Sequence, residues 1–140
     1  MSLNNKSILI VDDHELTLKM LSVIFQLAGA RVLIENDCKG AYRALKQIRP
    51  DIIILNLREI DIDDSVYCEQ IKEKFSKSII PLIVTSTIPL SQYKERLSYL
   101  EGIQYFQKPY SSLHLLETVS ELLKVAMPPK KAESLNLRAE

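Results

Sequence analysis

Charged and hydrogen-bonding side chains directly follow four short apolar segments of this chain. They are Asp12 and Asp13, Asn56, the hydroxyl series Thr85, Ser86 and Thr87, and Lys108. If the four segments are parallel strands of one sheet, their carboxyl ends meet at the edge where open α/β sheets bind ligands. The sequence therefore predicts one pocket that combines two carboxylates, an amide, hydroxyls and an ammonium group.

The strands that position these side chains are recognisable as short apolar runs. Four of the runs, at residues 8–11, 52–55, 82–84 and 105–107, precede the polar side chains. A fifth run, at residues 31–35, is not followed by one of these side chains. Short and nearly continuous apolar runs are typical of strands buried on both faces of a parallel sheet. Because amphipathic segments separate the runs, the order predicts five βα units and an open sheet with helices on both faces.

The amphipathic segments carry apolar residues at spacings of three and four, which predicts helices. Their apolar positions are Leu18, Leu21 and Phe25; Ala41, Ala44 and Leu45; Cys68, Ile71 and Phe75; Tyr93, Leu97 and Leu100; and Leu113, Leu116 and Val119. Gly29 is expected to end the first helix, and Ser111 or Ser112 to cap the last. We expect one domain over residues 1–126, followed by a polar tail or linker stump over 127–140.

Composition excludes several function classes. The 140 residues contain 18 basic and 18 acidic side chains, so no net charge favours nucleic acid or an anionic membrane. No apolar stretch approaches the roughly 20 residues that a membrane span needs, and no signal-peptide segment opens the chain. Cys38 and Cys68 form no CxxC motif, so we expect two reduced thiols in a cytoplasmic protein.

The set of polar residues resembles the receiver domain of bacterial response regulators (CheY-like) across residues 6–125. This resemblance implies a flavodoxin-like sheet of strand order 2-1-3-4-5 with five helices. It also implies a non-enzymatic signalling domain of a two-component phosphorelay. Such a domain accepts a phosphoryl group from a histidine kinase on an aspartate at the end of the third strand, with Mg²⁺ bound.

Carried over to this chain, the resemblance assigns a role to each polar position. Asp12, Asp13 and the backbone carbonyl of Arg58 would be the Mg²⁺ ligands. Ser86, Thr87 and Lys108 would surround the phosphoryl group beside Asn56, and Lys108 would neutralise its oxygens. Ser86 and Tyr105 would form the switch, and the Lys108–Pro109 bond is a candidate cis peptide.

Asn56 departs from the family, because the phosphoacceptor must be a carboxylate. The following loop departs as well, since Glu59-Ile60 replaces the usual Met-Pro and Asp64 replaces the usual glycine. We therefore expect a pseudo-receiver with weakened Mg²⁺ binding that acts through protein contacts. Its partners would be a histidine kinase, another signalling protein, or a second copy bound through the fourth helix, fifth strand and fifth helix.

Other interpretations stay open at this point. If Asn56 is an Asp-to-Asn substitution that blocks phosphorylation, the chain is an ordinary phosphorylatable receiver. Asp12 and Asp13 have a purely structural role if they only cap the first helix and pair with Lys108. A flavin- or nucleotide-binding enzyme of the same fold has little support, because Gly29, Gly40 and Gly102 form no phosphate-binding loop.

Overall fold

The sheet has the strand order that the resemblance implies. The computed structural model describes residues 2–58, 66–76, 80–92 and 103–123. Five parallel strands form one sheet in the order β2-β1-β3-β4-β5. Their bounds are β1 Ser7–Val11, β2 Arg31–Glu35, β3 Ile52–Asn56, β4 Leu82–Ser86 and β5 Gln104–Gln107. The predicted flavodoxin-like architecture is confirmed, and the second strand matches the predicted residues 31–35.

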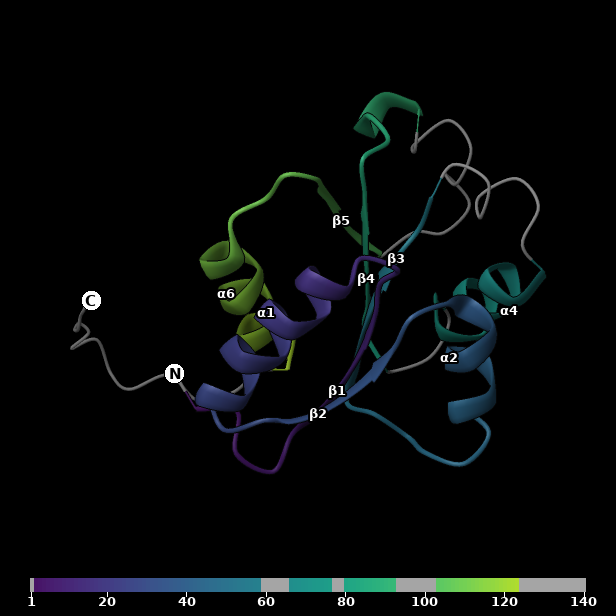
Figure 1. Ribbon diagram of the computed structural model, residues 1–140. Helices are drawn as coiled ribbons and strands as arrows, with labels where there is room; N and C mark the ends of the chain where they lie inside the picture. The colour runs from purple at the N-terminus through teal and green to yellow at the C-terminus, as the bar shows by residue number, and fades with distance from the viewer. Residues whose placement is uncertain (1, 59–65, 77–79, 93–102, 124–140) are drawn as a thin grey trace.

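Helices cover both faces of the sheet (Figure 1). The described helices are α1 Glu15–Leu27, α2 Cys38–Ala44, α4 Val66–Ser76 and α6 Ser112–Leu122. Helices α1 and α6 lie on one face, and α2 and α4 lie on the other (Figure 1). The helix predicted around Tyr93 to Leu100, and the predicted tail 127–140, fall outside the described residues.

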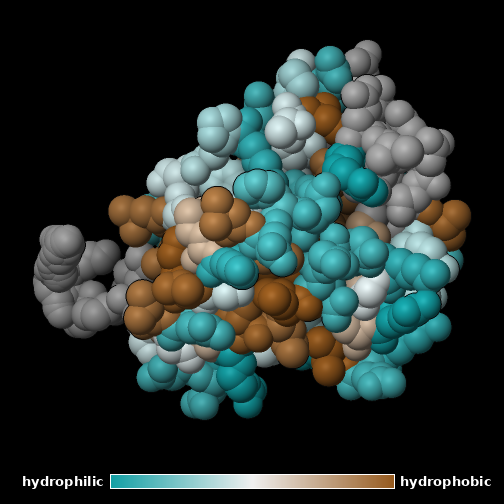
Figure 2. All heavy atoms as spheres, in the orientation of Figure 1, coloured by the Kyte–Doolittle hydropathy of each residue, from teal (hydrophilic) through white to brown (hydrophobic). Residues whose placement is uncertain are grey.

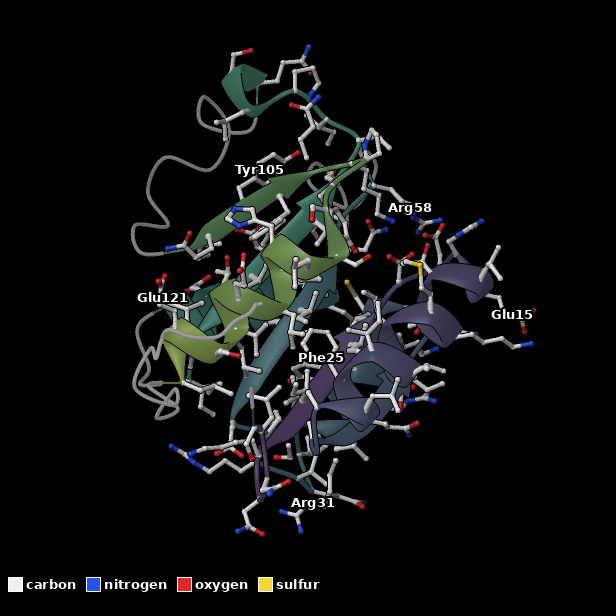
Figure 3. The ribbon with its side chains drawn as sticks, turned by 90° about the vertical axis from the view of Figure 1, so that its left-hand side faces the viewer. Glu15, Phe25, Arg31, Arg58, Tyr105 and Glu121 are labelled. Carbon is white, nitrogen blue, oxygen red and sulfur yellow. The ribbon has the colours of Figure 1, made fainter. Side chains whose placement is uncertain are left out.

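Two apolar clusters separated by the sheet form the core. Alternate side chains of a strand point to opposite faces, so Ile8 and Ile10 pack with α1 and α6, whereas Leu9 and Val11 pack with α2 and α4. Phe25 is fully buried between α1 and the sheet (Figure 3). Burial on both faces explains why the strands are apolar without alternation.

The ends of the helices follow the expected capping chemistry. Gly29 takes the left-handed conformation, with φ of 99°, directly after the last turn of α1. The Ser111 hydroxyl accepts a hydrogen bond from the backbone N–H of His114 at 3.1 Å and so caps α6. These two results confirm the stop at Gly29 and decide the N-cap in favour of Ser111. Asp37 caps α2 in the same way, through the N–H of Gly40 at 2.7 Å, and the sequence analysis missed it.

The oxidation state of Cys38 differs from the one that the sequence predicts. Its side chain is disulfide-bonded in the structure, so the expectation of two reduced thiols is wrong. The isolated spacing of the cysteines carried no sign of a pairing, because partners in a disulfide only need to be close in space. Within the described residues, no helix is both long enough and apolar enough to cross a membrane.

Candidate functional site

The parallel register brings the predicted polar residues to one edge of the sheet. The paired positions there are Val11 with Leu55, Asn56 with Thr85, and Ser86 with Gln107. The residues that follow β1 and β5 therefore lie at the same edge as the last residues of β3 and β4. In Figure 3, Arg58 and Tyr105 lie toward this end of the sheet.

An ion pair spans this edge from β5 to β1. Lys108 Nζ lies 2.8 Å from Asp12 Oδ2, although 96 residues separate the two in the chain. Asp12 is only 3% exposed, and its Oδ1 accepts a hydrogen bond from the backbone N–H of His14 at 2.9 Å. Both carboxylate oxygens of Asp12 are thus engaged by protein groups. A buried carboxylate needs such partners, because an unpaired charge is costly away from water.

Asn56 uses both ends of its side-chain amide. Its Nδ2 donates to Asp13 Oδ1 at 3.2 Å, and its Oδ1 accepts from Thr85 Oγ1 at 3.2 Å. The amide therefore bridges the acidic loop after β1 to strand β4. A carboxylate at this position has no proton to donate to Asp13 and would repel it.

Ser86 and Tyr105 form a second cluster with the loop after β4. The Ser86 hydroxyl accepts from the N–H of Ile88 at 3.2 Å, and the Tyr105 hydroxyl donates to the carbonyl of Ile88. Burial raises the pKa of Tyr105, and a hydrogen bond with the Ser86 side chain acts in the opposite direction. The predicted switch residues are therefore in contact and jointly hold Ile88.

A cavity of about 310 Å³ opens at this edge. It is lined by Val11, Asp12, Asp13, Asn36, Asp37, Cys38, Asn56 and Arg58. The structure thus brings the predicted metal positions and Asn56 together. Ser86 and Lys108 lie beside the cavity rather than in its lining, and Thr87 is exposed after β4.

Some contributions to the site were missed by sequence reasoning. The loop between β2 and α2 adds Asn36, Asp37 and Cys38 to the cavity, and Thr85 supplies the hydroxyl that contacts Asn56. A polar Asn-Asp pair directly after the second predicted strand was a usable signal for this loop. The unusual residues Glu59, Ile60 and Asp64 lie outside the described residues.

The sequence as a whole identifies the family of this site. Residues 8–120 match the family of response regulator receiver domains. The chain belongs to this family. Receiver domains are generally non-enzymatic signalling domains of two-component systems, interact with histidine kinases and other signalling proteins, and typically bind Mg²⁺ at the phosphorylation site.

Individual relatives agree with this family. The polar-differentiation response regulator DivK of Brucella anthropi is 23% identical over 118 residues, which cover 84% of this chain and 96% of DivK. The alkaline phosphatase synthesis transcriptional regulatory protein PhoP of Bacillus subtilis is 25% identical over 86% of this chain. The matched region covers 49% of PhoP, so this receiver domain spans about half of that relative's length.

Solved structures share the fold. A two-component response regulator from Clostridium difficile superposes with a TM-score of 0.73 at 21% identity, covering 86% of this chain and 98% of that one. The signal receiver domain of a histidine kinase from Syntrophus aciditrophicus gives a TM-score of 0.72 at 25% identity, with 94% and 98% covered. These similarities show the receiver fold.

The two predicted carboxylate ligands of a cation already have protein partners in this receiver domain. Asp12 is held by Lys108 and His14, and Asp13 accepts from Asn56. Among the described residues, no group of three or more His, Cys, Asp or Glu side chains is placed to hold a metal ion. The positive charge next to Asp12 in this structure is that of Lys108.

The ion pair predicts a stability loss that a second substitution reverses. Lys108→Met leaves the Asp12 carboxylate buried without its partner, and we expect the free energy of unfolding to fall by about 3 kcal/mol. The Asp12→Asn/Lys108→Met double variant removes the unpaired charge and should recover at least half of that loss. Chemical denaturation measures both values. Lys19→Met, at an exposed position of α1, is the control and should change the free energy of unfolding by less than about 0.5 kcal/mol. Equal losses of stability in Lys108→Met and Lys19→Met would contradict the role given to the ion pair.

Tyr110 makes the domain sensitive to alkaline pH. Burial and the neighbouring charge of Asp12 raise the pKa of its phenol to about 12 from the usual 10.0. Within the described part of the chain, its buried hydroxyl has no hydrogen-bond partner. Because the folded-state pKa exceeds the unfolded-state value, this phenol contributes stability below pH 10 that is lost as pH rises through 12.

Tyr110→Phe should therefore flatten the alkaline loss of stability. We expect the free energy of unfolding of the variant to decrease less steeply between pH 10 and pH 12 than that of the parent. At neutral pH the substitution should be nearly neutral, because the hydroxyl it removes makes no hydrogen bond to a described residue. Denaturant titrations across this range provide the measurement. Tyr67→Phe, on an exposed ring, is the control, and an unchanged slope in Tyr110→Phe would contradict the assignment.

Proposed function

We propose that this receiver domain is a pseudo-receiver that is not phosphorylated at residue 56 and acts through protein contacts. The bridge from Asp13 through Asn56 to Thr85 is the observation that carries this proposal. Both hydrogen bonds suit an amide, and one of them requires its N–H. The surrounding side chains therefore accommodate asparagine as a structural part of the site, which favours a natural residue over an Asp-to-Asn block.

The chemistry of the acceptor supports the same conclusion. Formation of an acyl phosphate needs an anionic carboxylate oxygen as nucleophile. The Asn56 amide oxygen is neutral, and it already accepts a hydrogen bond from Thr85. The other residues assigned to the phosphoryl pocket are Ser86, Thr87 and Lys108. The Ser86 hydroxyl accepts a hydrogen bond from Ile88, and the Lys108 ammonium group pairs with Asp12. Neither of these contacts is with Asn56.

We propose further that Mg²⁺ binding is weakened. Its ligands would be Asp12, Asp13 and the backbone carbonyl of Arg58, and the cation would polarise phosphoryl oxygens if one were present. Asparagine at residue 56 removes one negative charge from the ligand set. At an effective dielectric near 20, a unit charge about 4 Å from another contributes roughly 4 kcal/mol. The Lys108–Asp12 pair reduces the remaining negative charge.

The proposed output is recognition by a signalling protein. The candidate contact face consists of β5, α6 and the helix predicted over residues 93–100, which lies outside the described residues. Tyr105 on β5 links this face to the site, because its hydroxyl and Ser86 hold the same residue, Ile88. This face is also the one through which the family resemblance implies a homodimer. A nucleotide- or flavin-binding enzyme gains no support from the family match.

Phosphorylation by a small-molecule donor tests the main proposal. After incubation with Mg²⁺ and acetyl phosphate, the parent should show no phosphoryl adduct in its intact mass. Asn56→Asp should gain one adduct, because it restores the carboxylate nucleophile. Asn36→Asp is the matched control, since it adds a carboxylate to the same cavity away from the end of β3. An adduct on the parent would sink the proposal, and one on Asn36→Asp would show that acceptance is not specific to residue 56.

Calorimetric titration with Mg²⁺ tests the weakened cation site separately. Asn56→Asp adds a negative charge beside Asp12 and Asp13, and we expect it to bind Mg²⁺ at least about tenfold more tightly than the parent. Asn36→Asp should change the affinity much less, because it lies on another loop, after β2. Equal affinities of the parent and Asn56→Asp would show that residue 56 does not set the affinity for the cation.

A further inference from the structure

Strand β2 forms one edge of the sheet and exposes apolar side chains. Among the described strands it pairs only with β1. Its residues Leu33 and Ile34 are 40% and 49% exposed, whereas β1 and β3 are buried except for one residue each. Figure 2, in the orientation of Figure 1, shows hydrophobic side chains between α1 and α2, where β2 lies. This edge is therefore apolar surface without a neighbouring strand in the described part of the chain.

The hydrogen bonds to β1 decide which backbone groups of β2 point outward. The N–H of Arg31 donates to the residue before β1 at 2.8 Å, and the carbonyl of Glu35 accepts from the residue after β1 at 3.1 Å. In a parallel pair, alternate residues direct their backbone groups to the same neighbouring strand. Leu33 therefore also faces β1, whereas Val32 and Ile34 direct their N–H and C=O groups away from the sheet. No hydrogen bond from a described residue reaches these four groups.

Free backbone groups at an apolar edge select an extended segment as the partner. An edge strand is a template for pairing with another strand, and natural proteins usually protect such edges with charges, proline or a bulge. The three central residues of β2 are apolar, and the strand contains neither proline nor glycine. A helix could cover these side chains, but its own backbone groups are already paired and could not bond to the edge. A strand satisfies both the side chains and the backbone.

The sequence of β2 identifies the complementary strand. It reads Arg-Val-Leu-Ile-Glu, with a basic residue at one end, an acidic residue at the other and three apolar residues between them. The same sequence in the reverse direction opposes each charge with the opposite charge and each apolar residue with an apolar residue. Opposite charges and apolar side chains that face each other across two strands are stabilising. A second copy of β2, running antiparallel, therefore complements this edge along its whole length.

We propose that two copies of this chain dimerise by pairing their β2 strands antiparallel about a two-fold axis at Leu33. Val32 of one copy then lies opposite Ile34 of the other. These pairs exchange both N–H···O=C bonds, because their backbone groups point outward. Arg31 lies opposite Glu35 in a non-hydrogen-bonded pair, where cross-strand side chains are closest. The direction of the backbone groups and the order of the charges thus require the same register.

The two charged side chains are available for these ion pairs. Within the described residues, the side chains of Arg31 and Glu35 have no ion-pair or hydrogen-bond partner. The Glu35 carboxylate lies beside Gly40 of α2. Because residues 31 and 35 are separated by four positions in a strand, Arg31 points to the same face of the sheet. Each copy therefore contributes one unpaired cation and one unpaired anion to the same face of the contact.

This proposal is independent of the proposed loss of phosphorylation. It does not use Asn56, and β5, which belongs to the homodimer face that the family resemblance implies, forms the opposite edge of the sheet. The failure of either proposal therefore leaves the other unaffected.

Sedimentation equilibrium of the full chain measures the assembly. We expect the parent to approach twice its mass of 16.0 kDa. Arg31→Glu and Glu35→Arg each convert two pairs of opposite charge into two pairs of like charge, and each should raise the dimer dissociation constant at least about tenfold. The Arg31→Glu/Glu35→Arg double variant restores opposite charges with their signs exchanged. It should recover most of the lost affinity.

The backbone bonds have tests of their own. Amide hydrogen exchange of Val32 and Ile34 should slow as the protein concentration rises through the dissociation constant, because dimerisation pairs these N–H groups. Ile34→Pro removes one outward N–H, which a strand at the edge of a sheet tolerates. We expect this variant to be a folded monomer by thermal unfolding and sedimentation. The charge variants, at the ends of β2, test the contact even if the proline substitution unfolds the domain.

Arg49→Glu is the matched control, because it makes the same change of charge at an exposed position in the loop before β3. It should dimerise like the parent. A parent that stays monomeric at about 1 mM protein, where even weak dimers form, overturns the proposal. So does an Arg49→Glu variant that is weakened as much as Arg31→Glu, or a double variant that stays as weak as the single variants. Exchange at Val32 and Ile34 that does not depend on protein concentration would also overturn it.

Discussion

The ion pair between Lys108 and Asp12 links the ends of strands that are distant in sequence, and the arrangement of the site depends on it. Lys108 follows β5 and Asp12 follows β1, with β3 and β4 between them in the sheet. The pair forms only when all these strands are in register. Because Asp12 is buried, its negative charge is stable there only while Lys108 is paired with it. The edge of the sheet is therefore held by electrostatics as well as by strand packing.

Asn56 lies between these ends and changes the balance of charge. With a neutral amide there, one lysine offsets one of the two carboxylates, and the other carboxylate accepts a hydrogen bond from the amide. A carboxylate at residue 56 would instead concentrate negative charge and favour a divalent cation. In this receiver domain, the polar groups of the site therefore form hydrogen bonds and an ion pair with one another.

The strands and their order could be predicted because both depend on local patterns. Continuous apolar runs such as 52–55 require burial on both faces, and alternating helical segments require a parallel sheet. The positions of Asp12, Asn56 and Lys108 at one edge of the sheet could be predicted because the carboxyl ends of parallel strands meet there. The contributions of Asn36 and Thr85 could not, since they depend on how a loop folds over the edge and on which hydroxyl faces the amide. The disulfide of Cys38 was missed for the same reason, as it depends on distance in space.

The sequence by itself determined the layered α/β fold, the position of the polar edge and the absence of a nucleophilic carboxylate at residue 56. These properties follow from residue type and periodicity, which need no knowledge of neighbours in space. Only the tertiary structure decided which groups bond to which. It paired Lys108 with Asp12, placed Thr85 rather than Ser86 against Asn56, and left apolar side chains of β2 exposed. Hydrogen bonds and burial depend on distances of a few ångströms between segments far apart in the chain, and sequence patterns do not contain those distances.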